Sequence, residues 1–191
     1  EGSSLLTSNS ENSEVYELYN TKAEIQIALA DAISGSDQRT DAYLNVLHML
    51  KNITKLSKTG NSFSWHLIAK VNMKLELYHE AILAATITIS IDPNDADSFF
   101  VLSEAYAREF ESVGEKIVLL KSMQATDDVK KQSLLDGLKK DKDDARLKAA
   151  RALKKAIIGD SAYLKLKSAD FETLPADYET QIFNPTKSML Y

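Results

Sequence analysis

The chain has 191 residues, of which 44% are hydrophobic and 27% charged, the balance of a folded globular protein and not of a disordered one. The net charge is −5, which gives no overall attraction to nucleic acid or to an anionic membrane. The absence of cysteine excludes disulfides, thiolate metal sites and cysteine nucleophiles. Six glycines and three prolines are too few for the frequent tight turns of an all-β fold.

The chain opens with a Ser/Asn-rich stretch, residues 1–13, which reads as a flexible lead-in. From Glu14 apolar residues recur at spacings near three, four and seven, the pattern of an amphipathic helix that ends at Ser34–Asp37 around Gly35. The apolar stripe of this helix consists of Val15, Leu18, Tyr19, Ile25, Leu29 and Ile33.

Four further helices are predicted before residue 114. The second carries an apolar stripe from Tyr43 to Leu56, and the third runs over 63–75. The fourth runs over 78–91 and ends at Asp92–Pro93, because proline disfavours helical backbone in the preceding residue. Asp95 is predicted as the N-cap of the fifth helix.

Beyond Gly114 the pattern predicts shorter helices over 116–123, 129–138 and 144–158. Residues 161–191 contain two prolines and scattered apolar side chains, which predicts a C-terminal segment packed on the helices in extended or short helical form.

One segment has the pattern of a strand. Residues 85–91 alternate and are rich in β-branched side chains. They continue the helical pattern of residues 80–84 without a break, however, and no second run of this kind is present to pair with them. The helical interpretation is therefore preferred.

A repeat emerges around the third and fourth helices. Trp65, Ile68, Ala69, Ala81 and Pro93 stand where the tetratricopeptide repeat places its opening aromatic, its Leu-Gly pair, its small second-helix residue and its closing proline. Shifted by 34 residues, the first-helix positions are occupied by Phe99, Leu102 and Tyr106. The chain resembles the tetratricopeptide family over about residues 62–112 and more weakly elsewhere.

The resemblance implies an all-α fold, a right-handed superhelical array of antiparallel helix pairs over residues 14–160. It also implies a concave groove, lined by the first helices of successive repeats, that binds an extended peptide or a partner helix. The matching groove positions are Phe63, His66, Lys70, Met73, Lys74, Asp97, Phe100, Glu104 and Arg108.

No residue pattern predicts catalysis. The three histidines, His48, His66 and His79, do not have the i, i+3 or i, i+4 spacing that places two imidazoles on one metal ion. No glycine-rich phosphate loop or hydrolase motif is present. We therefore expect no catalytic residues, no bound metal, no cofactor, no small-molecule substrate and no enzymatic activity.

Charge is concentrated in residues 130–155, which contain ten basic side chains and four acidic ones. A solvated helix face is the simplest interpretation, and an acidic partner or the acidic half of a second copy are alternatives. Nucleic acid is disfavoured because no aromatic residues are interleaved for base stacking.

The functional prediction is a non-enzymatic scaffold or adaptor that binds a protein segment in its groove. A variant is that residues 171–191 fold back and occupy that groove. The alternative function is a regulatory, assembly or chaperone subunit of a bacterial envelope or secretion complex, docking through its convex or basic face. The compartment is left unknown, although the lack of cysteine and of an initial methionine and the Ser/Asn-rich lead-in favour an exported or periplasmic protein over a cytoplasmic one.

Overall fold

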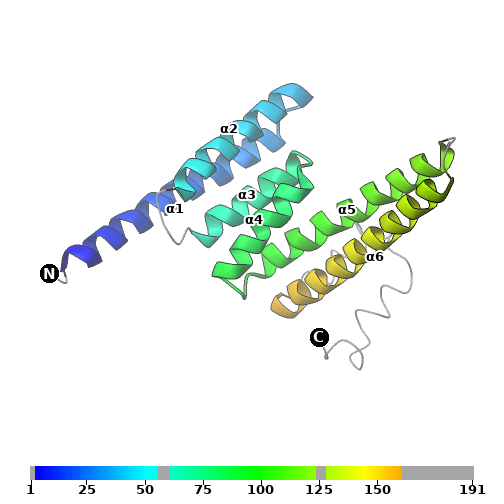
Figure 1. The fold of residues 1–191 in the computed structure, drawn as a ribbon. Coiled ribbons are helices and arrows are strands. Elements are labelled where there is room, and N and C mark those ends of the chain that lie inside the picture. The colour runs from blue at the N-terminus through cyan, green and yellow to red at the C-terminus, as the bar shows by residue number, and fades with distance from the viewer. Residues whose placement is uncertain (1–2, 56–60, 124–127, 161–191) are drawn as a thin grey trace. The chain divides into compact units, whose positions relative to one another are not determined.

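The computed structural model describes residues 3–55, 61–123 and 128–160, with side chains from residue 14 onward. All regular secondary structure in these ranges is helical, so the all-α prediction is confirmed for them (Figure 1). The helices are α1 (Ser3–Asp31), α2 (Ser36–Thr54), α3 (Ser62–Lys74), α4 (Tyr78–Ile91), α5 (Ala96–Ser122) and α6 (Asp128–Gly159). The predicted C-terminal segment, residues 161–191, lies outside the described residues.

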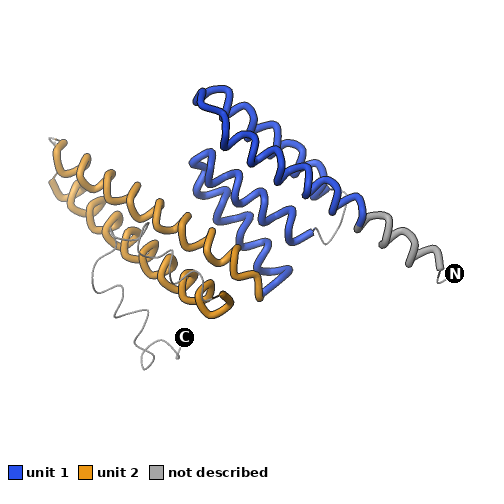
Figure 2. The backbone as a smooth tube through the Cα atoms, turned by 180° about the vertical axis from the view of Figure 1, so that it is seen from behind, with its two compact units in different colours: residues 1–93 blue, residues 94–191 orange. Residues whose placement is uncertain are grey.

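The chain divides into two compact units, Glu1–Pro93 and Asn94–Tyr191 (Figure 2). Unit 1 contains α1 to α4, and unit 2 contains α5 and α6. Helices that follow each other in sequence pack together within each unit, and in unit 1 α1 also contacts α3.

The seam between α3 and α4 is built from small side chains. Ala69 of α3 and Ala81 and Ala85 of α4 are completely buried. Side chains of this size let two helix backbones approach closely. These contacts form the core of unit 1 around the best-matching repeat positions.

Helix α1 differs from its prediction in two respects. It begins at Ser3, so most of the segment predicted as a lead-in is helical, and Glu14 marks a change of composition inside one helix. The buried side of α1 carries Tyr16, Ala23 and Ala30, not the predicted apolar stripe. The stripe is turned to solvent, with Leu18 68% and Leu29 63% exposed.

The alternating segment over 85–91 forms the second half of α4. Its hydroxyl groups bond back to the helix: Thr86 Oγ1 donates to the Ile82 carbonyl at 2.7 Å, and Thr88 Oγ1 donates to the Ala84 carbonyl at 3.1 Å. These bonds satisfy polar groups inside the helix, and Thr88 is thereby buried without an unpaired hydroxyl. The helical interpretation of this segment is confirmed.

The turn between α3 and α4 depends on one residue with left-handed backbone. Glu76 has φ of 59°, which is unusual for a residue with a side chain. The Leu77 amide donates to the Asn72 carbonyl at 2.9 Å, and the Glu76 amide donates to the Met73 carbonyl at 3.1 Å. This is a Schellman arrangement, in which a glycine would normally occupy the position of Glu76.

Unit 2 is a hairpin of two long antiparallel helices. Asp95 caps α5 as predicted, its carboxylate accepting from the Ser98 amide at 3.1 Å. The predicted break at Gly114 is wrong, because α5 continues through it, and the helices expected over 129–138 and 144–158 are one helix, α6. A Cβ at Gly114 would lie 3.2 Å from Lys142 Nζ, so this glycine leaves room for the end of the Lys142 side chain.

Candidate interaction surface in unit 1

Helices α1 and α3 run parallel, side by side. Ser64 Oγ on α3 donates to Asn20 Oδ1 on α1 at 2.7 Å across 44 residues of sequence. Lys74 Nζ donates to Asp31 Oδ1 at 2.8 Å across 43 residues. Because the separation is almost the same at both points, each α1 residue from Asn20 to Asp31 lies level with the α3 residue about 43 or 44 positions further along the chain.

The junction at the start of α3 is a small polar cluster. Asn61 is the N-cap, and its Oδ1 accepts from the Ser64 amide at 3.1 Å. The same oxygen accepts from Asn20 Nδ2 at 3.3 Å. An ordinary helix cap therefore also fixes α1 against α3, and both Asn20 and Ser64 are buried.

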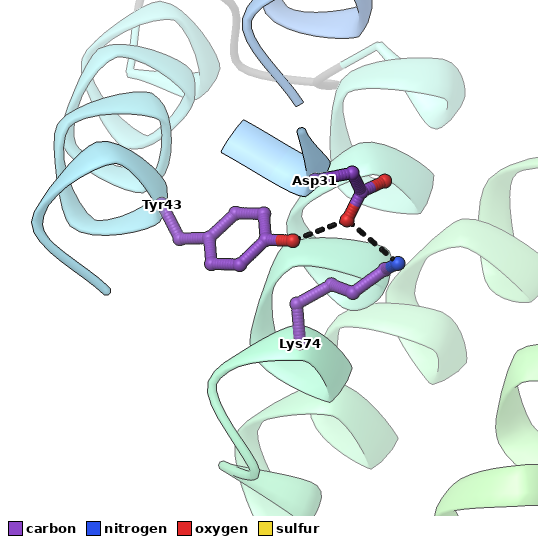
Figure 3. A network of polar contacts seen from close by, with 3 residues as sticks. All are labelled: Asp31, Tyr43 and Lys74. Carbon is purple, nitrogen blue, oxygen red and sulfur yellow. Dashed lines mark hydrogen bonds and ion pairs between the residues drawn. The ribbon is translucent and has the colours of Figure 1, made fainter. Parts of the chain in front are cut away.

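The junction at the end of α3 is charged (Figure 3). Asp31 Oδ1 accepts from Lys74 Nζ and from the hydroxyl of Tyr43 on α2, so three helices meet at one carboxylate. Burial by itself raises the pKa of Asp31, but the hydrogen bonds from Lys74 and Tyr43 and the lysine charge outweigh it and hold the pKa below its ordinary value. Burial and the hydrogen bond to Asp31 raise the pKa of Tyr43 to about 12.

The exposed sides of α1 and α3 next to this contact line form one surface. At 3.6 residues per turn, Glu17 and Glu24 follow Asp31 along one side of α1, about 100° around the helix from the buried Tyr16 and Ala23. On α3 the exposed strip borders α1 on that same side of the two parallel helices. We call this surface the α1–α3 face; its residues are Glu17, Glu24, Asp31, Phe63, Lys70 and Lys74.

The α1–α3 face has opposite charges on its two helices. The α1 side is acidic, the α3 side is basic, and an aromatic ring, Phe63, stands at the start of α3 with 41% of its surface exposed. Asp31 and Lys74 pair at one end, while the carboxylates of Glu17 and Glu24 and the ammonium of Lys70 are exposed to solvent. Such a surface can anchor one apolar side chain and orient charged groups on both sides of it.

Three of the five groove residues predicted on α3 belong to this face: Phe63, Lys70 and Lys74. Met73 is half-buried. His66 is only 2% exposed, and its ring stacks on that of Phe63 with centroids 6.0 Å apart. The expected surface position of His66 is therefore wrong, because the neighbouring aromatic ring and the helix packing cover it.

The four groove residues predicted on α5 lie in unit 2. Asp97 and Arg108 are exposed, and Arg108 pairs with Glu111 at 3.0 Å on the same helix. Glu104 and Phe100 are half-buried, and Phe100 packs against a core cluster that contains Leu153 of α6. Phe100 is therefore part of the hairpin packing.

Four of the eight repeat-signature residues are buried in their own units. Ile68, Ala69, Ala81 and Phe99 are buried, whereas Trp65, Leu102 and Tyr106 are half-buried and Pro93 is exposed. Three aromatic rings on α5 have lysines of α6 above them: Lys155 over Phe99 at 5.0 Å, Lys148 over Tyr106 at 5.6 Å and Lys142 over Phe110 at 4.5 Å.

These contacts give part of the basic stretch 130–155 a role inside unit 2. Lysines over aromatic faces gain cation–π attraction along the hairpin. Lys148 also pairs with Asp144 at 2.7 Å and Lys139 with Asp136 at 2.9 Å, so acidic residues of the same helix neutralise part of the charge. The stretch is more than a solvated helix face, because it also joins α6 to α5.

A scan against protein-family models finds no match for the sequence, and a search of curated proteins finds none either. Among the described residues, no helix combines the length and apolar character needed to cross a membrane. Within those same ranges, no three histidine, aspartate or glutamate side chains are grouped as a metal site.

The acidic side of the α1–α3 face was not predicted. Its signal is present in the sequence, since Glu17, Glu24 and Asp31 recur every seven residues and so lie along one line of a helix. The predicted apolar stripe of the same helix lies on a different side of it. Only the packing of α1 against α3 shows which exposed line of α1 borders the α3 residues.

Proposed function

We propose that the protein is a non-enzymatic interaction scaffold, with the architecture of a tetratricopeptide-like array, that binds a peptide or a partner helix. The observation that carries the proposal is the α1–α3 face. Two parallel helices, held together by polar contacts at both ends of α3, present one acidic row and one basic row, and the basic row begins with an exposed aromatic ring, Phe63. Binding would use this pre-formed surface without any chemical step.

The helix packing of unit 1 supports the tetratricopeptide-like interpretation. The first helix of one pair, α1, lies parallel to the first helix of the next, α3, and α2 packs against α3. Small residues at the α3–α4 seam occupy the positions that the resemblance assigns to them. In such arrays the first helices line the binding surface, which corresponds here to the α1–α3 face.

The test is a peptide-display selection on the full chain, followed by affinity measurements with surface variants. Phe63→Ala and Lys70→Glu should each weaken the selected peptides about tenfold, or about 1.4 kcal/mol, because they remove the aromatic anchor and reverse a charge. Leu83→Ala is the matched control, since Leu83 is an exposed apolar residue on α4 outside this face.

Two results would contradict the proposal. One is a set of peptides whose affinity is unchanged by both face variants. The other is an equal loss in the Leu83→Ala control, which would show that the peptides attach to exposed apolar surface in general. Circular dichroism of each variant establishes that the helices are intact before affinities are compared.

A further inference from the structure

The two rows of the α1–α3 face have the same internal spacing. Glu17 and Glu24 on α1 are seven residues apart, and so are Phe63 and Lys70 on α3. At a rise of about 1.5 Å per residue, each pair spans about 10.5 Å, or two helical turns. A partner that contacts both members of each row must present its own side chains at about this spacing.

A helix has this spacing, and an extended strand does not. Two helical residues seven apart also lie about 10.5 Å apart, on one side of their helix. Side chains on one side of a strand lie about 6.7 Å apart, or about 13.4 Å at the next repeat. A strand that contacts one member of a row therefore misses the other.

The same pair of helices already accommodates a helix on its other side. Helix α2 packs against both α1 and α3, so it lies in one of the two troughs between them. The acidic row is about 100° around α1 from the buried Ala23, which places the α1–α3 face in the second trough. A trough between two parallel helices receives the side-chain ridges of a third helix.

We propose that the α1–α3 face binds a partner helix whose charges complement its two rows; this inference rests on the proposed scaffold function. One edge of the partner helix carries two basic side chains seven residues apart, opposite Glu17 and Glu24. The adjacent edge carries an apolar side chain opposite Phe63 and, seven residues from it, an acidic side chain opposite Lys70. Both carboxylates and the ammonium group are exposed, so these charges can pair with a partner.

The stagger of the two rows gives the order of these residues in the partner. Phe63 directly precedes Ser64, which is level with Asn20, so Phe63 lies between the levels of Glu17 and Glu24. The apolar residue of the partner therefore lies between its two basic residues. Lys70 is level with positions 26–27 of α1, beyond Glu24, so the acidic residue lies outside the basic pair.

The probe is a labelled synthetic helix of alanine and glutamine that carries this pattern, and its binding to the full chain is measured by fluorescence anisotropy. Glu24→Lys should weaken the probe about tenfold, because it places like charges together. Replacing the facing lysine of the probe by glutamate should restore the affinity, which a merely misfolded variant would not allow. Glu80→Lys is the matched control, an exposed position on α4 outside this face, and should change nothing.

Two altered probes test the helical geometry. Lysines five residues apart lie about 140° apart around a helix, so this spacing should weaken binding about tenfold. A proline in the middle of the probe should weaken it at least tenfold, because proline breaks the helix.

Binding that tolerates the proline and the shifted lysine but is lost in Phe63→Ala would overturn the helical partner and leave the scaffold function standing. An unchanged affinity in Glu24→Lys, or an equal loss in Glu80→Lys, would overturn the charge pairing. Absence of probe binding, while display-selected peptides still depend on Phe63 and Lys70, would also overturn the inference. Selected peptides that are insensitive to both Phe63→Ala and Lys70→Glu contradict the scaffold function itself.

Discussion

The charged junction at Asp31 should contribute measurably to the stability of unit 1. The ion pair with Lys74 has both side chains about half exposed, which limits it to about 0.2–1 kcal/mol. The hydrogen bond from the largely buried Tyr43 has an ionised acceptor and is expected to contribute about 1.5–3 kcal/mol. Asp31→Ala should therefore cost about 2–3 kcal/mol, and Asp31→Asn, which keeps an acceptor, about 1 kcal/mol.

Urea unfolding followed by the fluorescence of Trp65 is the assay, because this is the one tryptophan of the chain and it lies in α3. Lys74→Met is the matched variant that removes only the ion pair, and it should cost less than about 1 kcal/mol. A free energy of unfolding of Asp31→Ala within about 0.3 kcal/mol of the wild-type value would show that the junction contributes nothing to the stability of unit 1.

The pKa shifts of Asp31 and Tyr43 predict that the stability of unit 1 falls at both low and high pH. The folded-state pKa of Asp31 is lowered, so its contribution is present above the unfolded value, near 4, and is lost as pH falls through the folded value. The folded-state pKa of Tyr43 is raised to about 12, so its contribution is present below the unfolded value, near 10, and is lost as pH rises toward 12. Tyr43→Phe should remove the alkaline loss and keep the acid one.

Three further variants test the packing. Lys155→Met should speed amide hydrogen exchange in α5 by removing about 0.5–1 kcal/mol of attraction to the Phe99 ring, and Arg151→Met, an exposed position on α6, should not. Ala81→Leu should lower the free energy of unfolding, measured by urea titration of the tryptophan fluorescence, by about 1–3 kcal/mol, because a completely buried alanine leaves no space for three more carbons. Glu76→Gly should raise the free energy of unfolding in the same assay by about 1 kcal/mol, because glycine adopts the left-handed backbone of this position without strain. Glu76→Ala keeps a Cβ and should give no such increase.

The helix boundaries that were predicted correctly have local causes. Proline at position 93 and the capping aspartate at 95 act on their immediate neighbours, so a short window of sequence contains the whole signal. The predicted end of the first helix around Gly35 is wrong, because α1 ends at Asp31 and Gly35 is the extended N-cap of α2, with φ of −78°. The helical state of residues 85–91 was also predictable, because the preceding turn is helical and no partner strand is available.

The errors concern contacts between distant residues. Gly114 resembles a helix stop by composition, but α5 continues through it, and the nearest side chain of α6 is that of Lys142. The stripe on α1 has the periodicity of a core face, yet periodicity alone cannot say whether a partner covers it. Likewise the burial of His66 depends on the ring of Phe63 and on neighbouring helices, not on its own residue type.

The hairpin of unit 2 has one closed and one open end, which bears on how it opens. Its cluster of Val113, Ile117 and Leu135 lies near the connection between α5 and α6, so these residues meet after closing a short loop. Lys155 and Phe99 come together only when a much longer loop closes, at the other end of the hairpin, which begins after residue 94. The first turns of α5 are nevertheless the buried ones, with Ser98 fully buried and Phe99 8% exposed, whereas Val118 and Leu119 near the connection are 68% and 63% exposed. Local opening within the hairpin should therefore expose the amides of the last turns of α5 before those of its first turns.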